Sequence, residues 1–79
     1  MPADAGATVT NRIRRLRFEH GEMTQQVLAD RVGVTRQTIV ALEAGKYVPS
    51  LLLAFRLARS FGVGVEQVFQ YDVGASAMG

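Results

Sequence analysis

The strongest constraint on the fold is a pattern, repeated three times, in which a hydroxyl residue opens and a glycine closes a short segment of helical apolar spacing. A threonine or serine hydroxyl can accept a hydrogen bond from a free amide at the start of a helix. Glycine readily takes the left-handed conformation that ends one. The pattern therefore predicts helices over residues 25–32, 36–44 and 51–61, capped by Thr24, Thr35 and Ser50 and ended by Gly33, Gly45 and Gly62.

Two further helices are expected, one on each side of these three. The first is predicted from Thr10 to His20, with Thr10 or Thr8 as its cap and with Ile13, Leu16 and Val9 as apolar positions. The fifth is predicted from Val65 to Phe69, and a short extended segment is expected over residues 70–73. Strand content is otherwise expected to be near zero. The prediction is an all-α, five-helix domain over residues 8–73, with flexible tails at residues 1–7 and 74–79.

Length and composition narrow the class of protein. A chain of 79 residues is long enough for one domain and not for two. The absence of cysteine excludes disulfides and thiolate metal sites. No apolar run approaches the roughly 20 residues that span a membrane. The first ten residues do not read as a signal peptide. We therefore expect a soluble, cytoplasmic protein without a membrane partner.

The segment from Thr24 to Ser50 has the form of a helix-turn-helix. Two short helices flank a tight turn at Gly33, and Ala29 is small enough for the second helix to cross the first closely. Val34 is expected to fill the corner. Ile39 and Leu42 are expected to hold the second helix against the core.

This segment resembles the XRE/Cro family of DNA-binding regulators. The residues that carry the resemblance are Thr24-Gln25, Leu28-Ala29, Gly33-Val34-Thr35-Arg36-Gln37-Thr38-Ile39, Leu42-Glu43, Gly45-Lys46 and Pro49-Ser50. The likeness extends over roughly residues 9–72. It implies a lambda-repressor-like DNA-binding domain, which in small members is dimeric and sometimes carries short strands near both termini.

The resemblance also makes the helix after Thr35 the recognition helix, which lies in the major groove. Arg36 and Gln37 lie in its first turn, away from the core side. Arginine can donate two hydrogen bonds to guanine, and glutamine can pair bidentately with adenine. An apolar side chain can contact a thymine methyl. The expected base contacts are Arg36, Gln37, Thr38, Val40 and Ala41.

Other groups are expected to contact the DNA backbone. Four arginines fall within residues 12–17 without an intervening acid, which is typical of a phosphate-binding surface. A solvated helix face remains the alternative explanation of that run. The expected backbone contacts are Gln25, Thr35, Lys46, Tyr47, Ser50, Arg14 and Arg15. The resemblance assigns Arg17 and Glu43 to a structural salt bridge.

The apolar residues near the C-terminal end exceed what one small core needs. We interpret the excess as a homodimer interface built from the fifth helix and the segment after it. Its expected members are Phe61, Val65, Val68, Phe69 and Tyr71.

These observations predict a transcriptional regulator, most simply a repressor, that binds a two-fold symmetric operator as a homodimer. The alternative is a protein-interaction module on the same fold, such as a bridging factor or an antitoxin-like partner. One histidine, no cysteine and no clustered acids argue against an enzyme. No cofactor, metal or small-molecule ligand is expected.

Overall fold

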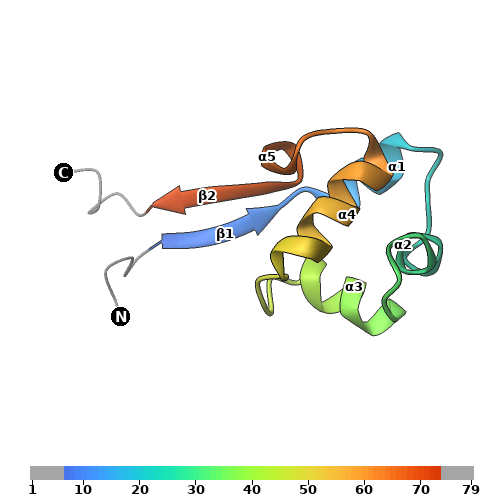
Figure 1. Cartoon of the computed structure of the whole chain (residues 1–79), viewed down its shortest axis with the longest axis horizontal. Coiled ribbons are helices and arrows are strands. Elements are labelled where there is room, and N and C mark those ends of the chain that lie inside the picture. Colours follow the sequence, from blue (N-terminus) through green and yellow to red (C-terminus); the bar gives the residue numbers. More distant parts are fainter. Residues whose placement is uncertain (1–6, 74–79) are drawn as a thin grey trace.

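The computed structural model describes residues 7–73, which form five helices and a two-stranded sheet. The elements are β1 (Ala7–Asn11), α1 (Ile13–Glu19), α2 (Gln25–Val32), α3 (Arg36–Glu43), α4 (Leu51–Phe61), α5 (Val65–Val68) and β2 (Phe69–Val73). The helices pack as one body, from which the strands extend to one side (Figure 1). The expected tails at residues 1–6 and 74–79 lie outside the described residues.

The three central helices begin at the residues that the capping pattern predicts. The hydroxyl of Thr24 accepts from an amide three residues on at 3.1 Å, that of Thr35 at 3.3 Å and that of Ser50 at 3.1 Å. Gly33 and Gly62 end α2 and α4 in the left-handed conformation, with φ of 76° and 68°. Local capping chemistry therefore sets these boundaries.

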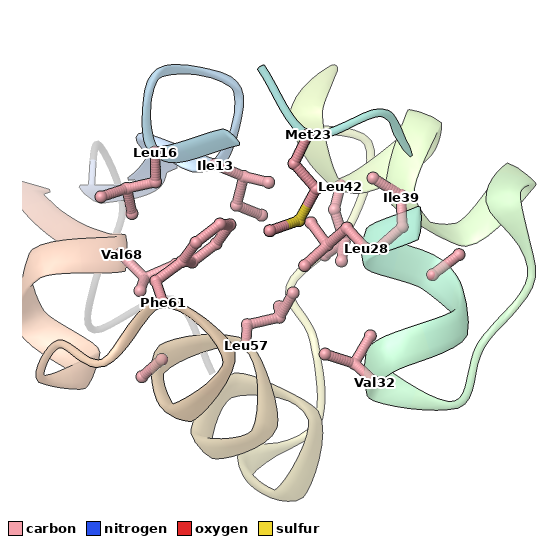
Figure 2. Packing of buried hydrophobic residues seen from close by; sticks show 12 residues of the cluster. Ile13, Leu16, Met23, Leu28, Val32, Ile39, Leu42, Leu57, Phe61 and Val68 are labelled. Atoms are coloured by element: carbon pink, nitrogen blue, oxygen red, sulfur yellow. The ribbon is translucent and has the colours of Figure 1, made fainter. Parts of the chain in front are cut away.

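The hydrophobic core lies where all five helices meet (Figure 2). Leu57 of α4 lies between Val32 of α2 and Phe61 of its own helix, and the Phe61 ring lies beside Val68 and is directed toward Ile13. The core side chains are Ile13, Leu16, Met23, Leu28, Ala29, Val32, Ile39, Leu42, Leu57, Ala58, Phe61 and Val68. Since both helices of the predicted helix-turn-helix contribute to this cluster, their mutual orientation is fixed by packing.

The chain enters the domain as a strand and not as a helix, which corrects four predictions. β1 pairs with β2 in antiparallel register from Ala7↔Val73 to Asn11↔Phe69. The first helix therefore begins at Ile13 and not at Thr10, neither Thr8 nor Thr10 caps it, and Val9 lies in β1. Ala7 belongs to the sheet and not to a tail.

The extended segment expected over residues 70–73 is confirmed as part of β2, and the short strands near both termini that the resemblance implied are present. The expectation of almost no strand elsewhere is wrong for residues 7–11. The physical reason is that β1 has its pairing partner about sixty residues further along the chain. The alternation of threonine and valine over residues 8–10 suits a strand, but it gains its hydrogen bonds only from β2. Phe69, expected to end α5, is instead the first residue of β2.

Candidate nucleic-acid interface

The helix-turn-helix is formed by α2, a left-handed turn at Gly33, and α3. The amide of Val34 donates to the carbonyl of Ala29 at 3.0 Å, which closes the turn on the end of α2. Ala29 is buried at the crossing, and Val34 packs against the core. The expected roles of Ala29 and Val34 are confirmed by these contacts.

The outer side of α3 carries the side chains that the sequence assigns to base recognition. Arg36, Gln37 and Val40 are exposed, while Thr38 and Ala41 are half-buried. Thr38 Oγ1 lies 3.1 Å from the capping hydroxyl of Thr35, so these two hydroxyls already have each other as partners. The most accessible reading groups are therefore in the first turn of the helix.

The C-terminal end of α3 is held by a buried ion pair between Arg17 of α1 and Glu43, the last residue of α3. Arg17 Nε donates to Glu43 Oε2 at 2.7 Å and Nη2 donates to Oε1 at 3.1 Å, with both side chains only 10% exposed. The third guanidinium nitrogen, Nη1, donates to the carbonyl of Met23 at 2.8 Å. The salt bridge implied by the resemblance is thus present, and it joins α1 to the end of α3.

Gln25, expected only as a phosphate contact, also belongs to this network. Its Nε2 donates to Glu43 Oε1 at 3.2 Å. The first residue of α2 is thereby linked to the last residue of α3. Glutamine at a helix start gives no sequence signal for this bond, because the partner lies 18 residues away.

A surface hollow brings together three basic or polar groups from different helices. Arg14 of α1, Gln25 of α2 and Arg36 of α3 all line it. The guanidinium groups of Arg14 and Arg17 both lie 5.7 Å from the centre of the exposed Phe18 ring. Arg17, Glu22 and Glu43 line the same hollow, and Glu43 is already paired with Arg17 and Gln25. The guanidinium groups of Arg14 and Arg36 are therefore its candidate phosphate ligands.

The structure does not bring Arg15 into this hollow. Its Nε is 3.1 Å from Glu19 Oε2, one turn along the exposed side of α1. The remaining predicted backbone contacts follow α3: Lys46, Tyr47 and Ser50 are exposed, and the hydroxyl of Ser50 caps α4.

The residues expected in the dimer interface differ in how far they are buried in the single chain. Phe61 and Val68 are only 4% and 0% exposed, because they complete the core of the single domain, so they offer no surface to a partner. Val65 and Phe69 are half-buried, and Tyr71 is exposed. Assigning Phe61 and Val68 to the interface is therefore wrong.

Larger exposed apolar groups occur on the other side of α4, where the sequence analysis did not place the interface. Leu51 and Phe55 are 71% and 55% exposed, Leu52 is also exposed, and so is Val48 in the loop before this helix. Phe55 lines a shallow groove with Val63 and Val65. The sequence signal was available, since α4 has apolar residues at more positions than one buried stripe requires.

The fold and the exposed first turn of α3 define a helix-turn-helix DNA-binding domain. A family model described as helix-turn-helix matches residues 13–68. The chain belongs to this family, in its XRE-type branch of DNA-binding transcriptional regulators.

Relatives from archaea and a bacterium carry the same description. An uncharacterized HTH-type transcriptional regulator of Methanocaldococcus jannaschii, MJ0272, is 50% identical over 62 residues, which is 78% of this chain and 92% of the relative. One from Methanothermobacter thermautotrophicus is 57% identical over 61 residues, covering 76% and 87%. YgzD of Bacillus subtilis is 48% identical over 59 residues, covering 75% and 88%.

Solved structures agree in fold. A protein of Bacteroides fragilis whose crystal structure carries a DNA-binding description superposes with a TM-score of 0.70 at 27% identity, over 80% of this chain and all of that one. A transcriptional regulator of Listeria innocua superposes with a TM-score of 0.63 at 23% identity, over 75% and 59%, which bears on the fold alone. Within residues 7–73, no helix has the length and apolarity needed to cross a membrane.

Proposed function

We propose that this chain is a sequence-specific repressor that binds a two-fold symmetric operator as a homodimer. The observation that carries the proposal is the division of α3 into an exposed first turn with Arg36 and Gln37 and a last turn held by the Arg17–Glu43 pair. A helix that is anchored at one end and free at the other can place its first turn against base edges. A dimer bound across a promoter excludes the polymerase, which is the simplest route to repression for a domain this small.

Base recognition is assigned to α3. Arg36 is expected to donate two hydrogen bonds to a guanine and Gln37 to pair with an adenine, each discriminating by about 1–3 kcal/mol. Val40, with Ala41 beside it, provides an apolar surface for a thymine methyl. Thr38 is a weaker candidate, since its hydroxyl already contacts that of Thr35.

Backbone recognition is assigned to the groups on either side of α3. Arg14 and Gln25 line the hollow that Arg36 also borders, and we place a phosphate beside the Arg14 and Arg36 guanidinium groups. Gln25 Nε2 already donates one hydrogen to Glu43, so only its second amide hydrogen is left for the phosphate. Lys46, Tyr47 and Ser50 are expected to contact the flanking backbone beyond the other end of α3, and the amide of Thr35 to contact it at the near end. Arg15 contributes less, because Glu19 offsets its charge.

The dimer surface is assigned to the exposed side of α4 together with the start of α5. Leu51 and Phe55 lie one helical turn apart, and Phe55 shares its groove with Val65. Contact between two copies would remove this apolar surface from water at about 25 cal/mol per Å².

The test is a titration of a duplex selected from a random pool against an unrelated duplex, with wild type and with the Arg36→Ala/Gln37→Ala double variant. The double variant should lose selectivity and keep weak, salt-sensitive binding to both duplexes. A matched control, Arg31→Ala/Gln67→Ala, removes one arginine and one glutamine that are exposed on α2 and α5. Selectivity that survives in the first variant would contradict the assignment of the reading residues.

A further inference from the structure

The last residue of β1, Asn11, joins the two-stranded sheet directly to the recognition helix. Its Nδ2 donates to the main-chain carbonyl of Leu42, in the last turn of α3, at 2.8 Å. Its Oδ1 accepts from the amide of Ile13, the first residue of α1, at 3.2 Å. We propose that Asn11 is a positioning residue for DNA reading, which sets the orientation of α3 from the terminal strands.

Asn11 itself is held firmly enough to act on another element. Its backbone pairs with Phe69 at the end of the strand ladder, and the next amide, of Arg12, donates to the carbonyl of Val68 at 2.9 Å. The side chain is half-buried, and both of its polar atoms have partners. One short side chain thus connects β1, the start of α1 and the end of α3.

The carbonyl of Leu42 is a point at which α3 can be oriented. Carbonyls in the last turn of a helix lack partners in the next turn and take them from elsewhere. The carbonyl oxygen of Leu42 accepts a hydrogen bond from the amide of Gly45, just beyond the end of α3, at 3.0 Å. It accepts a second one from Asn11 Nδ2 in β1. Arg17 and Gln25 hold α3 through the side-chain carboxylate of Glu43, whereas Asn11 binds its backbone.

The first turn of α3 has no comparable support. Within the described part of the chain, the side-chain hydrogen bonds to this turn come only from its own cap, Thr35. Core packing of Ile39 holds the underside of this turn, but no hydrogen bond from another element does. The fine orientation of Arg36 and Gln37 therefore depends on how the other end of α3 is fixed. Bidentate base contacts require a defined geometry, while contacts to phosphates tolerate a small tilt.

This inference rests on the proposed reading of bases by α3. Asn11→Ser is the informative variant, since a serine hydroxyl can still accept from the Ile13 amide but is too short to reach Leu42. Asn11→Asp keeps the shape and the acceptor and turns the donor into a second acceptor facing the Leu42 carbonyl. Phe61→Leu serves as the control, because it weakens the core beside Val68 and Ile13, on the opposite side of the cluster from Ile39 (Figure 2).

Two readouts separate positioning from general stability. In the free protein, amide hydrogen exchange within α3 should become about fivefold faster relative to α2 in Asn11→Ser, and faster still in Asn11→Asp, but not in Phe61→Leu. With DNA, the ratio of affinities for the selected and the unrelated duplex should fall by about fivefold in Asn11→Ser, a fold-change of the size that one net hydrogen bond accounts for. Affinity for the unrelated duplex should stay within about twofold.

The outcomes that contradict the positioning role differ from those that contradict the proposed function. Equal exchange changes in α2 and α3, or an unchanged affinity ratio in Asn11→Ser, would overturn the positioning role. If wild type itself shows no selectivity for any duplex, the proposed function fails, and faster exchange confined to α3 would still establish the link between the sheet and this helix.

Discussion

At the scale of single residues, Glu43 stands out because its carboxylate accepts hydrogen bonds from two other helices. It accepts twice from Arg17 and once from Gln25, and it is almost completely buried with its arginine partner. A buried ion pair adds little over well-packed apolar groups, but removal of one partner leaves the other charge unpaired. Arg17 would then lose two of the three acceptors that satisfy it.

Glu43→Ala should therefore lower the free energy of unfolding by about 3 kcal/mol. Urea denaturation followed by circular dichroism measures the change. The control is Glu19→Ala, which breaks an exposed pair with Arg15 and should change the same quantity by less than about 1 kcal/mol. Similar effects of the two substitutions would show that burial does not decide the contribution of the Arg17–Glu43 pair.

At the scale of elements, the turn between α2 and α3 depends on one backbone conformation. Gly33 has φ of 76°, and a Cβ there would meet only Arg56 Nη1 at 3.8 Å, so the constraint is conformational and not steric crowding by neighbours. A side chain other than glycine is strained at such a φ. The angle between the two helices is thus linked to the identity of this residue.

Gly33→Ala should lower the free energy of unfolding by roughly 1 kcal/mol, because alanine must adopt the left-handed conformation. Gly33→Asn is the matched comparison, since asparagine tolerates this conformation better, and its loss should be smaller. Thermal and urea denaturation of the two variants check the order. An alanine variant as stable as wild type would mean that the turn relaxes to another conformation.

Also at this scale, local chemistry decides which elements can be predicted from sequence. Capping hydroxyls and glycine stops lie within a few residues of the helices they bound, so α2 and α4 begin and end where the pattern places them. Residues 70–73 were expected to be extended, but β1 and its pairing with β2 could not be predicted in the same way, because the two strands are far apart in the chain. From neighbouring residues alone, Thr10 is a suitable helix cap, and only the distant strand β2 makes this segment a strand.

In the candidate site, too, features set by local spacing could be predicted and contacts between distant elements could not. Exposure of Arg36 and Gln37 follows from the helical spacing of Ile39 and Leu42 on the core side. The bonds from Gln25 to Glu43 and from Asn11 to Leu42 cross from one element to another, and no sequence pattern indicates them. The two faces of α4 were also not separable by residue type, since Phe61 is buried and Phe55 is exposed.

At the scale of the whole molecule, the proposed operator binding requires a second copy of the chain. The exposed side chains of Leu51 and Phe55 are large apolar groups on a domain of 79 residues, and a surface of this kind is a typical interaction site. Each copy then presents one recognition helix. Dimers of this motif contact half-sites about 34–36 Å apart, one turn of DNA.

Phe55→Glu should convert the protein to a monomer, because two carboxylates would be placed against an apolar surface. Equilibrium sedimentation at micromolar concentration measures the change. The fold should be retained, since Phe55 is exposed in the single chain. Val27→Glu introduces the same charge at an exposed valine of α2 and should leave the mass unchanged. Two variants of equal mass would place the contact elsewhere or exclude it.

The most direct test of the central claim is selection of bound duplexes from a random library by the purified wild-type protein. The account predicts enrichment of a symmetric consensus, with half-sites one helical turn apart and with guanine and adenine at neighbouring positions in each half. Titration of salt on the selected duplex should then give a steep linear loss of log affinity, with a slope of about 0.9 per phosphate contacted. Weak, salt-sensitive binding to every duplex without any enrichment would contradict the account and would indicate a protein partner.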